Sequence, residues 1–181
     1  MPRRTDKIEA LIEADDWKTA RKAIITALRK TPDSHWLLSR LALTHYEEFD
    51  YKKALKRDEQ ALRLAPNCPL ALWGYAGSLE MLGREREAIK IYSRLIKRGA
   101  KPIAYGECGE GLARARGLIA DSFYRMATCY ESLGQRKKAL AAFETHLDLR
   151  GPGCQSIYPL SDLNKEVNQL RKKRVHPSGA I

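Results

Sequence analysis

The sequence has no long apolar run. Hydrophobic residues make up 44% of its 181 residues, but no stretch of them approaches the roughly 18 to 20 residues that a membrane-spanning helix needs. The first ten residues, MPRRTDKIEA, also lack the apolar segment and the small-residue cleavage site of a secretory signal. Because the hydrophobic residues are spread evenly, wholesale disorder is excluded as well. We therefore expect a soluble, folded, cytoplasmic protein.

Cysteine and histidine are scarce and scattered. The four cysteines lie far from one another along the chain, which fits neither the paired spacing of a zinc site nor a dense disulfide framework. No two of the four histidines stand at the spacing of metal ligands. We expect reduced cysteines, no metal site and no cofactor. These residues are Cys68, Cys108, Cys129, Cys154, His35, His45, His146 and His176.

Catalytic motifs are also missing. The sequence contains no HExxH and no GxSxG, and no pair of carboxylates is placed convincingly for acid–base chemistry. Residues 106–111, GECGEG, are rich in glycine like a phosphate-binding loop. However, no strand is evident before them, no Lys-Ser or Lys-Thr pair follows, and Glu107 and Glu110 would repel a phosphate. The sequence thus predicts a protein that is not an enzyme and has no catalytic residues.

Acidic residues are too few to balance the basic ones. The chain carries 33 Lys and Arg against 22 Asp and Glu, which gives a formal net charge of +11. The excess is concentrated in residues 69–102, which carry +4, and in residues 151–181, which carry +3. A basic excess of this size raises polyanion binding as one candidate function.

What the sequence does contain is an internal repeat with a period of about 34 residues. Two columns of small or apolar residues and one column of prolines recur at this spacing, and repeats of this length indicate stacked supersecondary units. The columns are Ala20, Ala54 and Ala88; Ala27, Ala61 and Leu95; and Pro32 and Pro66.

Each repeat reads as two helices. Leu38, Leu41 and Ala42 form an apolar stripe at helical spacing, and a matching stripe recurs one period later from Leu72. The prolines that follow each second helix stop its continuation. Because such a helix pair cannot bury its apolar face alone, it must stack on its neighbours, which predicts an all-α solenoid.

These positions resemble the tetratricopeptide repeat (TPR) family over about residues 5–102 and 120–152. The resemblance implies a right-handed superhelical α-solenoid of about four TPR-like helix pairs with a C-terminal capping helix. The first repeat is degenerate, as expected of a terminal unit. The matching residues are Leu41, Ala42, Ala54, Ala61, Pro66, Leu72, Tyr75, Ala76, Gly83, Ala88, Tyr92, Leu95, Phe123, Met126, Ala127, Tyr130, Gly134, Ala139, Phe143 and Pro152.

An insertion interrupts the array. The phrase LGREREAI at residues 82–89 returns as LGQRKKAL at residues 133–140, which is later than one period would place it. The difference is an insertion, at about 103–119, that begins as a glycine-rich loop. From about Glu110 it becomes a helix that we expect to continue to about residue 133. The predicted repeats are about 1–34, 35–68, 69–102 and 120–152, and residues 153–181 are then a loop, a capping helix and a basic tail.

The first helices carry a second row of side chains that the core stripe does not explain. In TPR arrays this row lines the concave surface, so the resemblance implies a groove of aromatic side chains edged by arginines. These residue types dominate binding energy at protein interfaces. The alternative is that the insertion or the C-terminal helix covers them. The predicted partner-binding residues are Trp36, Arg40, Leu43, Tyr46, Trp73, Tyr124 and Arg125.

The predicted function is non-covalent. We expect a protein–protein adaptor or scaffold that binds a peptide or a helix, to which acidic groups would suit the arginines. The lysine and asparagine positions of the TPR carboxylate clamp are not reproduced here. The alternative is binding of nucleic acid or another polyanion, and a third reading is a structural subunit whose groove is filled by its own chain or a second copy. The polyanion-binding residues would be Lys90, Arg94, Lys97, Lys101, Arg171, Lys172, Lys173 and Arg174.

Overall fold

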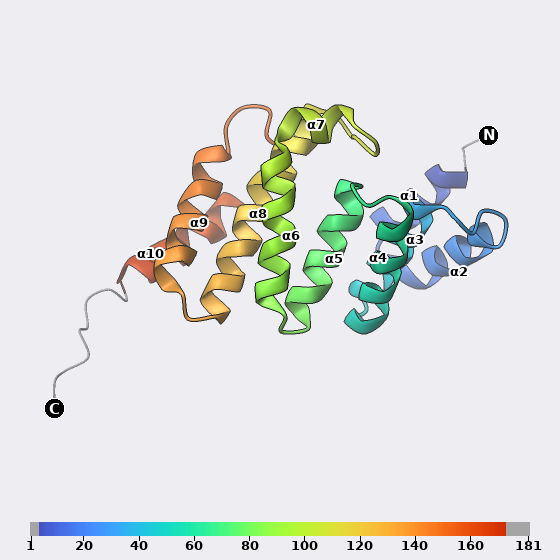
Figure 1. Ribbon diagram of the computed structural model, residues 1–181, viewed down its shortest axis with the longest axis horizontal. Helices are drawn as coiled ribbons and strands as arrows, with labels where there is room; N and C mark the ends of the chain where they lie inside the picture. The colour runs from blue at the N-terminus through green and yellow to red at the C-terminus, as the bar shows by residue number, and fades with distance from the viewer. Residues whose placement is uncertain (1–3, 173–181) are drawn as a thin grey trace. The chain divides into compact units, whose positions relative to one another are not determined.

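The computed structural model describes residues 4–172, and this part of the chain consists of ten helices and their connections, with no strand (Figure 1). The predicted all-α class is confirmed. None of the described helices is both long and apolar enough to cross a membrane. The chain divides into two compact units, residues 1–84 (unit 1) and residues 85–181 (unit 2). The division falls inside the predicted third repeat, so each unit is described by itself.

Unit 1 contains five helices, three of which begin at a side-chain cap. Asp16, Ser34 and Asp50 each accept a hydrogen bond from the backbone N–H three residues later, which satisfies one of the free donors at a helix start. The first three helices share a buried apolar cluster made of Ile8, Ile24, Ala27, Leu37 and Leu41. The helices are α1 (Arg4–Glu13), α2 (Trp17–Leu28), α3 (His35–Tyr46), α4 (Tyr51–Leu64) and α5 (Pro69–Met81).

The described part of unit 2, residues 85–172, also contains five helices. They are α6 (Glu85–Arg98), α7 (Ala100–Tyr105), α8 (Leu112–Ser132), α9 (Arg136–Leu149) and α10 (Leu160–Lys172). The short helix α7 differs from the predicted loop that begins at residue 103. It forms because Ile103 and Ala104 are buried against Ala115 of α8. Gly99, with φ 75°, separates α6 from α7.

The first helix of each of the four repeats, α1, α3, α5 and α8, ends in the same turn. The turn places one residue in the left-handed region, and the next backbone N–H donates to a carbonyl five residues earlier, which is the Schellman arrangement. Successive left-handed residues are separated by one period, by one period again, and then by one period plus the insertion. They are Asp15, Phe49, Gly83 and Gly134, with φ of 55°, 63°, 73° and 69°.

The insertion lengthens α8 at its N-terminal end. Pro69 begins α5, and its equivalent in the last repeat is Ala120, yet α8 begins two turns before that position, at Leu112. The first helix of the last repeat was predicted to extend into the insertion, and this is confirmed. It begins at Leu112 rather than at about Glu110. The added turns pack on α7 through Ala115, Leu118 and Ile119.

Helix α10 caps the end of unit 2. Val167 and Leu170 are buried in a cluster with Ala127 of α8 and Phe143 of α9. The guanidinium of Arg136 on α9 also donates a hydrogen bond to the carbonyl of Leu170. The predicted capping helix is therefore present, and it covers an apolar face that the last helix pair would otherwise expose.

Candidate partner-binding surfaces

In unit 1 the predicted row lies along α3. Trp36, Arg40, Leu43 and Tyr46 follow one another at helical spacing, and Trp36, Arg40 and Tyr46 are half-buried. Leu43 is half-buried too, and so is Trp73 on α5. These side chains therefore retain part of their surface for a partner while the rest of each is packed.

Arg40 is held in place by two neighbours. Its Nε lies 2.7 Å from Glu9 Oε1, which joins α3 to α1. Its guanidinium carbon stands 5.4 Å from the centre of the Trp36 ring, in the range of a cation–π contact. The Arg40 side chain retains only 16% of its exposure. The arginine thus fixes the Trp36 ring rather than projecting into solvent.

Trp36 also borders a small hollow. The hollow has a volume of about 220 Å³ and is lined by apolar atoms of Ile8, Ala27 and Leu37 together with Lys30, Thr31 and Ser34. A space of this size suits a single side chain rather than a drug-sized ligand, since ligand pockets start at about 300 Å³.

In unit 2 the equivalent row is covered by the chain itself. Residues 154–158, which we call the strap, run from the end of α9 across α8. Tyr158 of the strap stacks on Tyr124, with ring centroids 3.9 Å apart and an interplanar angle of 15°. Phe143 packs edge-on against the same Tyr124 ring at 5.3 Å. The Tyr124 hydroxyl donates to Glu166 Oε1 of α10 at 3.2 Å. A partner that binds the stacked face of the Tyr124 ring must therefore displace Tyr158 of the strap.

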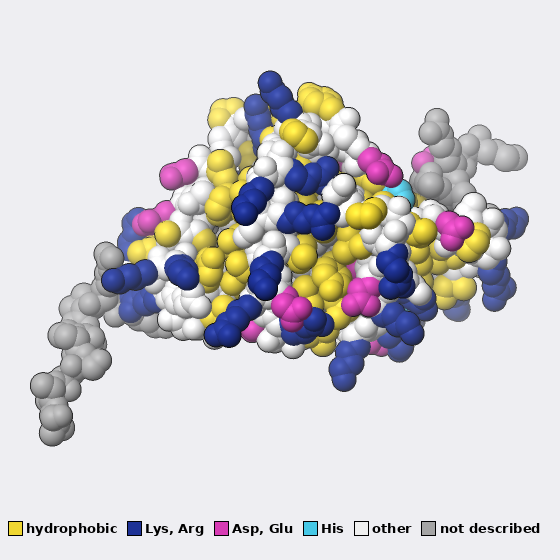
Figure 2. All heavy atoms as spheres, in the orientation of Figure 1, with side chains coloured by type: hydrophobic (Ala, Val, Ile, Leu, Met, Phe, Trp, Pro, Cys, Tyr) yellow, Lys and Arg dark blue, Asp and Glu magenta, His cyan; other side chains and the backbone are white. Residues whose placement is uncertain are grey.

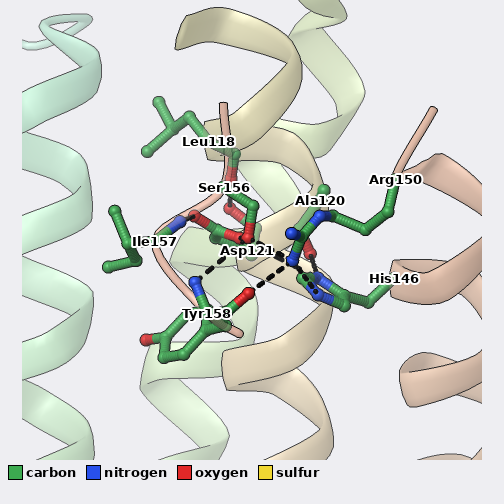
Figure 3. A network of polar contacts seen from close by, with 9 residues as sticks. Leu118, Ala120, Asp121, His146, Arg150, Ser156, Ile157 and Tyr158 are labelled. Atoms are coloured by element: carbon green, nitrogen blue, oxygen red, sulfur yellow. Dashed lines mark hydrogen bonds and ion pairs between the residues drawn. The ribbon is translucent and has the colours of Figure 1, made fainter. Parts of the chain in front are cut away.

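Asp121 anchors the strap (Figure 3). Its Oδ1 accepts a hydrogen bond from the Ser156 hydroxyl at 2.5 Å, and its Oδ2 accepts one from the Ile157 backbone N–H at 3.0 Å. The Asp121 side chain is almost fully buried. Burial raises the pKa of this carboxyl, and the two hydrogen bonds oppose that rise.

Arg150 and His146 complete the network. Arg150 Nη1 donates to the Tyr158 carbonyl at 2.5 Å and to the Ser156 hydroxyl oxygen at 2.8 Å. The fully buried His146 donates from Nδ1 to the Ala120 carbonyl at 2.7 Å. Burial lowers the pKa of this imidazole, and its Nε2 faces Arg150 Nη1 at 3.4 Å. Both side chains thus act as fixed supports beneath the strap.

Gly117 is where the strap comes closest to α8. A Cβ atom at this position would lie 1.7 Å from the Gln155 carbonyl oxygen, so no other residue leaves room for the strap. Close by, the Gln155 N–H donates to the Ala113 carbonyl at 3.1 Å. Ala113 and Gly117 both belong to the turns of α8 that the insertion adds.

Family models of the tetratricopeptide repeat match residues 45–106 and residues 121–145. These two stretches are tetratricopeptide repeats. No curated protein matches the sequence. TPR folds are known as non-enzymatic scaffolds for protein interactions. These repeats therefore support a protein–protein interaction module.

Solved structures of TPR proteins share the fold. The MamA 41-end chain from Desulfovibrio magneticus RS-1 has a TM-score of 0.71 at 14% identity, over 94% of this chain and 83% of that one. A crystal structure of MamA gives 0.68 at 18% identity, over 96% and 85%. The Sgt2 TPR domain from Aspergillus fumigatus gives 0.56 at 16% identity, over 81% and 87%. At these identities the likeness shows the α-solenoid fold alone.

Arg125 is turned toward the second TPR helix of the preceding repeat. Its Nε donates to the hydroxyl of Tyr92 on α6 at 3.3 Å. Tyr92 is itself fully buried, so this contact joins α6 to α8 inside unit 2. Arg125 is half-buried and has, like Arg40, a role in holding its own fold.

The predicted basic stripe is interrupted. Lys90, Arg94 and Lys97 are exposed on α6, but Lys101 lies on α7, because the left-handed Gly99 breaks the helix between them. The expectation of one continuous stripe is therefore wrong, although Lys101 is exposed too. Figure 2 shows Lys and Arg side chains spread over the face that α6 and α7 present.

The predicted basic tail is described only at its start. Arg171 pairs with Glu144 of α9 at 2.7 Å, and both side chains are largely exposed. Lys172 ends α10, while Lys173 and Arg174 lie outside the described residues.

Sequence reasoning missed three features of this TPR surface. The first is Asp121, whose equivalents in the other repeats are Trp36 and Leu70. A carboxylate at a position that is apolar in the other repeats was the available signal. Gly117 in the middle of a helix was the second signal, since such a glycine often marks a close approach. Nothing in the sequence pointed to the path of the strap.

Proposed function

We propose that this TPR chain is an adaptor that binds a peptide or a helix of a partner protein on the row formed by Trp36, Arg40, Leu43, Tyr46 and Trp73. The observation that carries the proposal is the arrangement of Trp36 and Arg40. The ring is half-exposed, is held by the guanidinium, and borders a hollow that can take one apolar side chain. A pre-positioned aromatic next to an arginine is a typical interface anchor.

The chemistry of the row describes its partner. Trp36, Tyr46 and Trp73 offer apolar surface with polar edges, which suits a segment with large apolar side chains. Arg40 already pairs with Glu9, so an acidic group on the partner would compete with that carboxylate. The proposed ligand is therefore mainly apolar, with acidic groups as a secondary feature.

The test uses two variants in capture experiments followed by titration. Trp36→Leu with Trp73→Leu removes both rings but keeps apolar side chains for the core. Lys90→Glu with Arg94→Glu and Lys97→Glu is the matched control on α6. We expect a purified partner to bind the ring variant at least about tenfold more weakly, since such anchors contribute about 2 kcal/mol or more. Equal affinity of the ring variant and the wild type would refute the proposed surface.

The second candidate function is polyanion binding, favoured by the exposure of Lys90, Arg94, Lys97 and Lys101. Binding of this kind releases counterions and weakens steeply with salt. Titration of a labelled single-stranded oligonucleotide at about 50 and about 200 mM salt separates the two functions. A loss of affinity of about a hundredfold or more, abolished by the α6 variant, would support the polyanion site, whereas weak binding at both salt concentrations would exclude it.

A further inference from the structure

The strap binds α8 as a peptide ligand would. Its contacts with α8, and with Arg150 at the end of α9, are made by one hydroxyl, two backbone N–H groups, two backbone carbonyls and one ring, from residues 155–158. Apart from the half-buried Cys154 and Tyr158, its apolar surface is open to solvent, since Ile157 is 66% exposed. The strap is thus held by polar recognition and one ring contact rather than by core packing.

The chain segments on both sides of the strap permit it to leave. Gly151, Pro152 and Gly153 precede it, and Pro159 follows it, so no regular helix or strand continues into it. Segments with few buried apolar contacts are those that open at the lowest free-energy cost. The capping helix α10 has its own apolar contacts through Val167 and Leu170, which do not depend on the strap.

A segment that replaces the strap must satisfy the same groups on α8. Asp121 is buried and accepts two hydrogen bonds from the strap. Water can hydrate the Asp121 carboxylate once the strap has left, but a segment that buries it again without supplying donors incurs the full desolvation penalty of that group. An incoming segment must therefore replace a hydroxyl donor, a backbone N–H and an aromatic ring in that order along the chain.

From these contacts we infer that the face of α8 between Ala113 and Tyr124 is a binding site for an extended peptide of the form hydroxyl residue, any residue, aromatic residue. The strap, with Ser156 and Tyr158, fills this site in the isolated chain, and a partner segment of the same chemistry displaces it. The site is distinct from the α3 and α5 row of the proposed function, so the two proposals fail independently.

The test offers the site a second copy of its occupant. The probe is a fluorescein-labelled peptide with the sequence of residues 153–160 and serine in place of Cys154. The receptor is the full chain carrying Ser156→Ala and Tyr158→Ala, which weakens the strap but leaves Asp121, Tyr124 and Gly117 intact. A peptide with alanine in place of its serine and its tyrosine is the control ligand.

We expect the strap-weakened chain to bind the probe at least about tenfold more tightly than the wild type. The reason is that a tethered strap competes at an effective concentration in the millimolar range. The control peptide should not bind, and Lys137→Ala, an exposed change on α9, should leave binding unaltered. If the folded strap-weakened chain does not bind the probe, or binds it no better than the wild type does, the inference is overturned.

A second measurement covers the case in which the strap-weakened chain does not fold. Cys154 lies at the start of the strap and is half-buried, and Cys108 is the other partly exposed thiol, since Cys68 and Cys129 are buried. In an otherwise wild-type Cys108→Ser chain, millimolar probe peptide should accelerate modification of Cys154 by a thiol reagent about threefold or more, in line with effective concentrations of that order. An unchanged rate, with the control peptide giving the same rate, would contradict displacement of the strap.

Discussion

The two units use the same repeat position in opposite ways. In unit 1 the row on α3 presents Trp36 beside a hollow, with Arg40 holding the ring. In unit 2 the equivalent of Trp36 is Asp121, which accepts two hydrogen bonds from the chain's own strap. The same position of the first TPR helix is thus part of an aromatic surface in unit 1 and a polar anchor in unit 2.

The insertion explains why only unit 2 can hold a strap. It adds the turns of α8 that carry Ala113 and Gly117, where Gln155 makes its backbone contacts. Helix α5, the first helix of the repeat before, begins at Pro69 and has no such turns. The repeat provides the helix pair, and the insertion provides the added turns of α8 that contact a bound segment.

The largest expected effect comes from removing Asp121, the anchor of the strap that distinguishes unit 2 from unit 1. Asp121→Ala leaves the Ser156 hydroxyl and the Ile157 N–H without their acceptor, and we expect a loss of about 2 to 3 kcal/mol in the free energy of unfolding. Urea denaturation measures the change. Asp148→Ala, an exposed carboxylate on α9, is the control and should change little. A loss below that of the control would show that the strap does not depend on Asp121.

Replacing a buried carboxyl in unit 1 should change the free energy of unfolding in the opposite direction. Asp58 is almost fully buried on α4, where Gly74 of α5 leaves room for it and the Ser78 hydroxyl donates to Oδ2 at 3.3 Å. Burial raises the pKa of Asp58 well above its ordinary value. The native state therefore binds the proton more tightly than the unfolded state, and stability falls as the pH rises from about 3.9 toward the raised pKa.

Replacing Asp58 with asparagine should remove this dependence. We expect Asp58→Asn to gain about 1 to 2 kcal/mol at pH 8 and almost nothing at pH 4, because the charged form no longer has to be buried. Thermal unfolding at both pH values checks this. Asp50→Asn is the control, since asparagine caps a helix about as well as aspartate does. Equal effects of Asp58→Asn at the two pH values would contradict the burial argument.

The shared turn gives a smaller comparison between the units. Phe49 adopts φ 63° and is 78% exposed, whereas Gly134 fills the same turn in unit 2 without strain. Phe49→Gly should gain about 0.5 to 1 kcal/mol, because it removes the cost of a left-handed conformation but loosens the unfolded chain. Gly134→Ala should lose about 1 kcal/mol. Chemical denaturation of both variants tests the pair, and changes of the same sign would refute it.

The smallest expected effect concerns Arg40. Its contact partners Glu9 and Trp36 are both partly open to solvent, so Arg40→Ala should cost only about 0.5 to 1 kcal/mol. Arg40→Lys keeps the charge but loses the planar contact, so its stability should fall between those of the wild type and Arg40→Ala. Urea denaturation measures all three chains. A loss above that of Asp121→Ala would reverse the ranking of the two units.

The period of the sequence was enough to predict the fold. The alanine columns indicated the helix pairs, and the wider spacing between LGREREAI and LGQRKKAL indicated the insertion and the long helix α8. These features follow from local periodicity, which the sequence displays directly. Helix α7 was missed because its burial depends on α8, which lies later in the chain.

The candidate sites were harder to predict than the fold. Trp36, Tyr46 and Trp73 could be placed on a first-helix face, since helical spacing decides which residues share a face. Which segment covers Tyr124 could not be predicted, because this depends on where a loop without periodicity returns. Contacts of this kind arise from tertiary structure, and only Asp121 and Gly117 left a trace of them in the sequence.

The most direct test of the contrast between the units is hydrogen exchange at the Ile157 amide, followed residue by residue in the wild type and in Asp121→Ala. The account predicts measurable protection of this amide in the wild type, despite the exposed Ile157 side chain, and loss of that protection in the variant. Exchange of the wild-type Ile157 amide at the rate of an unstructured peptide would contradict the account.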